Sequence, residues 1–257
     1  MNKEEEQLQK RLIELSNIAY QRNISTCSDF LNLHELNILH TTPKKMFPIP
    51  YETFGGYSYA ERQMAIFQPD ALYAFEDQRS PADYPIGLLK IRPLHPKFAQ
   101  ALNHRDYLGA ILNLGIERCK IGDIIVLQEE AAVFIQEKMV QYIMDSLSRI
   151  KHTAVTSELC QSQDFHYTPS YKEIKGTVAS VRLDSLLSLA FPLSRSKLTG
   201  LIEGAKVYVN GRLITTNSYH VRENDVISVR GMGKLAYKGL LSETKKGRHY
   251  VTIHKYI

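Results

Sequence analysis

The chain has 257 residues, of which 44% are hydrophobic and 23% are charged, and its formal net charge is +5. This length allows two or three small domains, and no apolar run approaches the ~20 residues that a membrane span needs. The acidic start MNKEEEQLQK does not resemble a secretory signal. Three widely spaced cysteines, Cys27, Cys119 and Cys160, indicate reduced thiols. We therefore expect a cytoplasmic protein with no membrane segment, no disulfide and no metal site.

Charge is distributed unevenly along the chain. From Tyr171 to the end there are 15 Lys and Arg against 6 Asp and Glu, whereas residues 1–170 carry 17 basic and 21 acidic residues. A basic C-terminal third favours a surface that meets a polyanion such as RNA. A solubilising basic face would explain the charge equally well.

Residues 1–75 are predicted to form a helical region. Apolar residues recur at three- and four-residue spacing between Leu8 and Ala19, which predicts a first helix. A second short helix is expected through Phe30, Leu33 and Leu36, and a further helical piece over Ala60–Phe67, after a glycine-containing turn.

Residues 76–160 are predicted to form a ferredoxin-like α/β plait. The apolar patterns follow the order strand, helix, strand, strand, helix, strand, which is the split βαβ arrangement. The expected elements are strand 86–91, helix 103–114, strand 123–127, strand 131–135, helix 137–147 and strand 151–159. This fold serves both RNA-binding and unrelated proteins, so it does not decide the function. Residues 161–176 are polar, contain Pro169 and are predicted to be a linker.

Residues 177–257 are predicted to form a compact α+β module. Arg182–Phe191 carries one apolar helical stripe and ends before a proline. Ser194 is a predicted N-cap for a second helix that exits at Gly204. Asn210-Gly211 predicts a hairpin turn, because both residues tolerate positive φ.

Two cations occupy the first turn of that second helix. Arg195 and Lys197 oppose the helix dipole there, at a cost of a few tenths of a kcal/mol each. The same helix end offers free backbone N–H groups that suit a phosphate. The favoured hypothesis is a phosphate-binding helix end; the alternative is two solvated charges tolerated by chance.

The segments RLDSLLSLAFPLSRSKLTGLIEGAKVYVNGRLI and VRENDVISVRGMGK resemble an S4 (S-four) domain, an RNA-binding module of about sixty residues. Thr199 and Asn224 depart from the usual small apolar residue and glycine, and both are expected to be tolerated. The resemblance implies the following RNA-binding residues: Arg182, Ser194, Arg195, Lys197, Lys206, Asn210, Arg212, Arg230 and Lys234.

The remaining segments resemble the bacterial YlmH family over nearly the whole length. They are CSDFLNLHELNIL, FGGYSYAERQMAIFQPD, NHRDYLGAILNLGIERCKIGDIIV and TKKGRHYVTI. The resemblance implies a non-catalytic, monomeric RNA-binding protein without a cofactor. Its implied partners are rRNA and tRNA on a stalled large ribosomal subunit that carries peptidyl-tRNA. The implied role is ribosome-associated quality control, in which the nascent chain receives an alanine tail.

An RNA-modifying enzyme that uses the S4 domain for docking is the alternative function. Arg182-Leu183-Asp184 resembles the catalytic segment of pseudouridine synthases, but here the chain continues into a helix. Asp184 is therefore expected to be a helix-start carboxylate. The nine histidines lack metal-ligand spacing.

Two further patterns have competing interpretations. His104-Arg105-Asp106 matches the start of a kinase catalytic loop, but Ile111 stands where that loop needs asparagine. Helix-start packing and RNA contact are equally good explanations, so His104 and Arg105 are candidates for a second RNA contact. The aromatics of the segment 54–59 could stack on bases, but core packing is expected instead.

Overall fold

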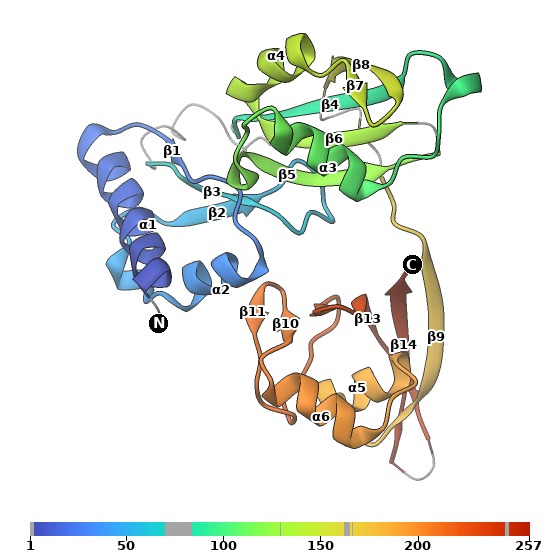
Figure 1. Ribbon diagram of the computed structural model, residues 1–257. Helices are drawn as coiled ribbons and strands as arrows, with labels where there is room; N and C mark the ends of the chain where they lie inside the picture. Colours follow the sequence, from blue (N-terminus) through green and yellow to red (C-terminus); the bar gives the residue numbers. More distant parts are fainter. Residues whose placement is uncertain (1–2, 70–83, 129, 162–164, 166, 245–246) are drawn as a thin grey trace. The chain divides into compact units, whose positions relative to one another are not determined.

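The computed structural model describes residues 3–69, 84–128, 130–161, 165, 167–244 and 247–257. The chain divides into two compact units, residues 1–167 and 168–257 (Figure 1). Among the described residues, no helix is both long and apolar enough to cross a membrane. The expected α+β class is confirmed, with an N-terminal helix, a central sheet and a C-terminal S4-type module.

The first unit begins with two helices beside a small antiparallel sheet of order β1-β3-β2. Asn32 and Glu35 form a capping box that starts the second helix. The helix predicted over Ala60–Phe67 is wrong: its second half is strand β3, buried at all four positions. A short, fully apolar run fits a buried strand as well as a helix. The elements are α1 (Lys3–Arg22), β1 (Thr26–Cys27), α2 (Leu33–Thr41), η1 (Lys44–Met46), β2 (Tyr51–Phe54) and β3 (Met64–Phe67).

The plait follows in the same unit and has the predicted order of elements. Its sheet order is β5-β6-β4-β8-β7, with antiparallel neighbours throughout. The boundary expected at 75/76 lies outside the described residues. The elements are β4 (Ile86–Pro93), η4 (Pro96–Phe98), α3 (His104–Asn113), η5 (Arg118–Lys120), β5 (Ile121–Val126), β6 (Ala131–Gln136), α4 (Glu137–Ser146), β7 (Arg149–Ile150) and β8 (Thr153–Cys160).

The two faces of the plait sheet are covered differently. Helices α3 and α4 pack on one face through a core that includes Tyr107, Ile111 and Ile143 (Figure 1). The other face is covered by the N-terminal elements, with Phe30 and Met64 in the same cluster as Phe134. Among the described residues of the first unit, the outer side of α3 and α4 is therefore the exposed broad side of the plait.

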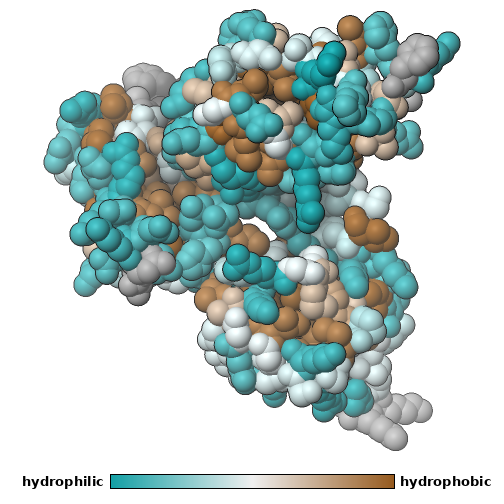
Figure 2. Space-filling model, viewed as in Figure 1, coloured by the Kyte–Doolittle hydropathy of each residue, from teal (hydrophilic) through white to brown (hydrophobic). Residues whose placement is uncertain are grey.

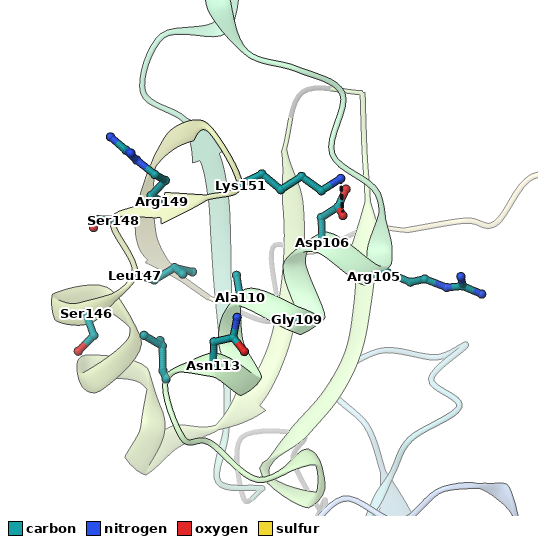
Figure 3. A pocket seen from close by; sticks show the side chains of 11 residues that line it. Arg105, Asp106, Gly109, Ala110, Asn113, Ser146, Leu147, Ser148, Arg149 and Lys151 are labelled. Carbon is teal, nitrogen blue, oxygen red and sulfur yellow. Dashed lines mark ion pairs between the residues drawn. The ribbon is translucent and has the colours of Figure 1, made fainter.

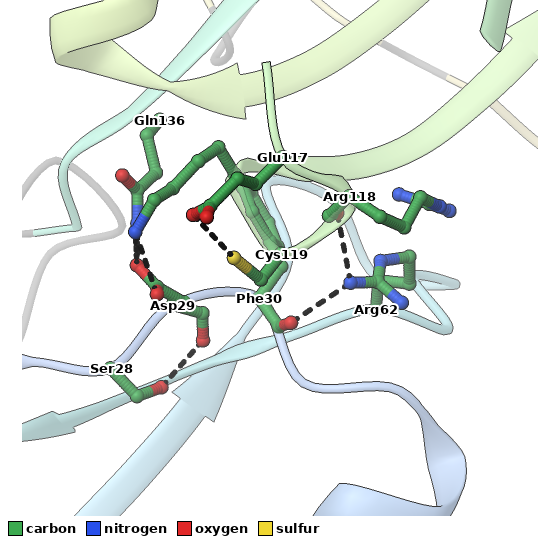
Figure 4. Close-up of polar contacts among 9 residues, drawn as sticks. Ser28, Asp29, Phe30, Arg62, Glu117, Arg118, Cys119 and Gln136 are labelled. Atoms are coloured by element: carbon green, nitrogen blue, oxygen red, sulfur yellow. Dashed lines mark hydrogen bonds and ion pairs between the residues drawn. The ribbon is translucent and has the colours of Figure 1, made fainter. Parts of the chain in front are cut away.

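Polar contacts also tie the N-terminal elements to the plait (Figure 4). Lys120 and Asp29 form an ion pair of 2.7 Å, and the Gln136 amide donates to the same carboxylate. The Arg62 guanidinium donates to the carbonyl of Phe30 at 2.9 Å. Because these bonds join segments about 30 to 110 residues apart in sequence, they fix the N-terminal elements against the sheet.

The second unit is a six-stranded antiparallel sheet of order β11-β10-β12-β13-β14-β9 with two helices. Leu183, Leu187, Leu198 and Ile202 of the helices share one buried cluster with the strands. The elements are β9 (Tyr171–Val178), α5 (Leu183–Ala190), α6 (Arg195–Glu203), β10 (Val207–Val209), β11 (Arg212–Leu213), β12 (Val226–Val229), β13 (Gly233–Glu243) and β14 (His249–Tyr256).

The linker predicted over residues 161–176 is wrong in its last third. Strand β9 begins at Tyr171 and pairs with β14 along its whole length. Ile174 and Val178 pack on the core of the second unit, while the polar residues between them face outward. Of the remaining linker positions, 162–164 and 166 lie outside the described residues.

Candidate RNA-binding site

The N-terminus of α6 is built to attract an anion. The Ser194 hydroxyl caps the helix and accepts from the backbone N–H of Lys197 at 3.4 Å, as predicted. Arg195 and Lys197 are exposed, and the first turn contains no carboxylate. Within the described part of the chain, the backbone N–H groups of Arg195 and Ser196 have no hydrogen-bond acceptor. Two free N–H groups and two cations together favour a phosphate.

A glycine in the middle of α6 was not among the predicted site residues. Gly200 lies one helical turn after Ser196 and Lys197, and a Cβ built on it meets nothing within 4 Å. Glycine in a helix interior costs about 1 kcal/mol relative to alanine, and no internal packing requires it here. An exposed glycine in a helix lets a ligand approach the helix backbone closely. A glycine inside a predicted polar helix is therefore the sequence signal that could have indicated this position.

Lys206 and Arg230 form a second basic group at the other end of α6. The two residues stand at neighbouring strand ends, where the Arg230 N–H donates to the Lys206 carbonyl at 2.8 Å, and both are exposed. The Lys206 N–H donates to the Leu201 carbonyl at 3.0 Å, so α6 separates this group from Arg195 by roughly 10 Å of helical rise. The structure therefore divides the predicted residues into separate groups along α6.

The hairpin contributes one exposed cation and one structural residue. Arg212 is exposed on β11 opposite Val209. The Asn210 amide is already used: its Nδ2 donates to Asp225 at 2.7 Å, and its Oδ1 accepts from the Val226 N–H at 2.9 Å. Both ends of this amide therefore bind within the fold and fix the hairpin, and the RNA contact of the exposed Asn210 side chain stays a prediction.

Arg182 also has an internal partner. Its guanidinium makes two bonds to the Asp184 carboxylate, at 2.8 and 3.2 Å. Asp184 accepts in addition from the Ser185 N–H at 2.9 Å. The expected role of Asp184 at the start of α5 is confirmed. Arg182 keeps about a third of its side chain exposed (37%) and can still reach a phosphate from this pair.

Lys234 is the second residue of strand β13 and is partly buried. Burial lowers the pKa of its ammonium from 10.5 to about 8. It follows that the charge of this predicted RNA contact is costly in the free protein and is partly lost at mildly alkaline pH.

Replacing Lys234 with Met should stabilise the protein more at pH 7 than at pH 9.5. Between pH 8 and 10.5 the unfolded state binds more protons than the folded state, so wild-type stability rises with pH across this window. The stability of Lys234→Met lacks this rise with pH, so the difference in Tm between Lys234→Met and the wild type should shrink as the pH increases. Thermal melts of both proteins at the two pH values test this; a constant difference would contradict the buried charge.

The two candidates for a second RNA contact lie in the first unit, at the start of α3. His104 and Arg105 are exposed beside the capping box of Asn103 and Asp106. Partial burial, and next the charge of Arg118, lower the pKa of His104. His104 is therefore mostly neutral at pH 7, and Arg105 is the stronger phosphate partner of the two.

Comparisons with known proteins agree with this structure. Residues 80–164 match the family described as "Putative RNA-binding domain in YlmH", and residues 181–227 match the S4 domain. The chain is 27% identical over 254 residues to "Ribosome-associated protein quality control protein P2" of Bacillus subtilis (strain 168), covering 98% of this chain and 96% of the relative. "Cell division protein ylmH from Streptococcus pneumoniae" is similar in fold, with a TM-score of 0.51 and 24% identity over 64% of this chain and 95% of that chain. The chain therefore contains the domain described as a putative RNA-binding domain in YlmH at residues 80–164, followed by an S4 domain at residues 181–227.

Proposed function

We propose that this protein is a non-catalytic adaptor that binds rRNA and tRNA through the α6 side of its S4 domain. The observation that carries the proposal is the N-terminus of α6, where Arg195 and Lys197 flank two backbone N–H groups without acceptors. Lys206, Arg212 and Arg230 extend the positive charge along the same module. Contacts of this kind bind the backbone of structured RNA and require no chemistry on it.

The partner that we propose is a stalled large ribosomal subunit that carries peptidyl-tRNA. The relative from Bacillus subtilis is named for ribosome-associated quality control and aligns along almost the whole chain. By this resemblance the protein acts in the cytoplasm as a monomer and supports alanine tailing of the nascent chain.

Replacing Arg195 with Ala should weaken binding to large ribosomal subunits roughly ten- to hundredfold. The guanidinium can fork onto two phosphate oxygens, which the ammonium of Arg195→Lys copies only in part. The Tm should not fall, because a cation in the first turn opposes the helix dipole. Co-sedimentation at several salt concentrations measures the affinity. The slope of log affinity against log salt should become shallower by about one phosphate contact.

Lys172→Ala is the matched control, since Lys172 is an exposed cation on β9 in the same unit. It should change subunit binding by less than about threefold. Wild-type binding by Arg195→Ala would refute the α6 site, and an unfolded Arg195→Ala would assign Arg195 a structural role.

The alternative, an RNA-modifying enzyme, gains no support from the residue that first suggested it. Asp184 is held by Arg182 and by the first turn of α5. Incubating the protein with rRNA or tRNA and common methyl donors, followed by nucleoside analysis, separates the two functions. A new modified nucleoside would refute the non-catalytic role.

A further inference from the structure

The plait cannot bind RNA in the way that many plaits of this topology do. Such domains commonly stack bases on aromatic side chains of the open sheet face. Here that face is covered: Tyr57 stacks on Phe134 at 4.9 Å, and Phe165 and Tyr167 pack around them. The expectation that Tyr57 serves core packing is confirmed. Any RNA contact of this domain must therefore use its helical face or an edge.

The helical face contains a groove of about 480 Å³ between α3 and the turn that joins α4 to β7 (Figure 3). This volume is in the range of binding sites for small ligands, about 300–1,000 Å³. Ala110, Leu114 and Leu147 contribute apolar surface, and Asn113 and Ser146 contribute polar groups. Over α3 and α4, the surface in Figure 2 likewise shows hydrophobic side chains bordered by hydrophilic ones.

Cations surround this groove. Arg105 lies on α3. Arg149 lies on β7 and Lys151 in the turn after it; both are exposed, and Ile150 between them is buried. The one carboxylate lining the groove, Asp106, is already paired with Lys151 at 2.7 Å. Within the described residues, Arg105 and Arg149 have no acidic partner. In Figure 3 their side chains point outward from the two sides of the groove, so they are free to turn toward a ligand.

We propose that this groove binds the sugar–phosphate backbone of RNA, as a second contact besides the α6 site. The proposal rests on the proposed function, because it assumes an RNA partner. Two unpaired guanidiniums suit phosphate oxygens bidentately. Hydroxyl and amide groups inside the groove can meet the ribose 2′-hydroxyl, which marks RNA. His104 lies next to Arg105 but does not line the groove. In this proposal the second RNA contact is therefore made by Arg105 and Arg149 instead of Arg105 and His104.

Substitution of Gly109 tests the groove without changing its charge. Gly109 lies inside α3 at the groove, and a Cβ built on it meets nothing within 4 Å. The Cβ of a larger side chain at this position would therefore meet no described atom, and the side chain would extend into the groove. Glycine is also unfavourable inside a helix, so a substitution should not unfold the domain.

Binding of full-length variants to rRNA extracted from large ribosomal subunits tests the groove. Arg105→Gln with Arg149→Gln should lower the affinity about tenfold and make the salt dependence shallower by roughly two phosphate contacts. Gly109→Leu should also lower the affinity severalfold, with an unchanged or raised Tm. Lys44→Gln with Lys45→Gln removes the same charge from exposed residues elsewhere in this unit. This control should stay within about twofold of wild type.

The outcomes separate this site from the α6 site. Equal losses in the groove variant and the lysine control would overturn the groove as a specific site. A loss of rRNA binding in Gly109→Leu alone would mean that the two arginines do not hold phosphates, and would also overturn the proposed backbone contact. If the groove variants bind as wild type while Arg195→Ala does not, only the groove fails. If Arg195→Ala also binds as wild type, the proposed function fails with it.

Discussion

A fragment that begins at Ala179 should not fold, whereas one that begins at Thr168 should fold and retain RNA binding. Strand β9 covers the edge of β14 with eight residue pairs. Val178 is 5% exposed, and Leu189 of α5 packs directly over Gly176. Removal of β9 would expose this apolar surface and a long unpaired strand edge, which favours aggregation. The family match at 181–227 omits β9, so a fragment cut at those bounds should fail as well.

Circular dichroism, thermal melting and gel filtration of the fragments measure this difference. A fragment that begins at Tyr171 is the control, because it keeps all of β9. Of the hydrogen bonds between described residues, it loses the one from the Ile257 N–H to the Ser170 carbonyl. It should melt cooperatively, close to the fragment that begins at Thr168. A cooperative melt of the fragment that begins at Ala179 would show that β9 is dispensable.

The elements that were predicted correctly are those specified by local patterns. The stripe of Leu183, Leu186 and Leu187 defines α5, and the Ser194 cap defines the start of α6. The turn at Asn210 and Gly211 was predicted because both residues adopt positive φ, at 48° and 77°. Such signals lie within a few residues of the feature that they specify.

The failures depend on partners that are distant in the sequence. Strand β9 has a polar outer side and is held by β14, more than seventy residues later. The Asn210 amide binds Asp225, fifteen residues away, so its turn was predictable and its side-chain contact was not. Of the groove residues, Lys151 was expected at the start of strand 151–159, and Arg149 lay between that strand and the helix predicted before it. Nothing in the sequence places them beside α3.

Asp123 is a further case of such a distant contact. This carboxylate on β5 accepts from the Tyr57 hydroxyl at 2.9 Å and from the backbone N–H groups of Glu61 and Arg62 at 2.7 and 3.2 Å. Burial raises the pKa of Asp123, whereas these three donors favour its charged form. The donors come from the loop before β3, so one side chain joins that loop to the plait.

Replacing Asp123 with Ala should therefore destabilise the first unit by about 3–5 kcal/mol. Three hydrogen-bond donors would lose their acceptor, and the Arg62 guanidinium would lose a neighbouring negative charge. Asp123→Asn should cost less, since its carbonyl oxygen still accepts. Asp145→Asn is the control. Asp145 is exposed and, among the described residues, accepts a hydrogen bond only from Gln141, so the stability change should stay within about 0.5 kcal/mol. Denaturant unfolding of residues 1–167 measures each value. A loss below about 1 kcal/mol in Asp123→Ala would mean that apolar packing, rather than this carboxylate, holds the loop on the plait.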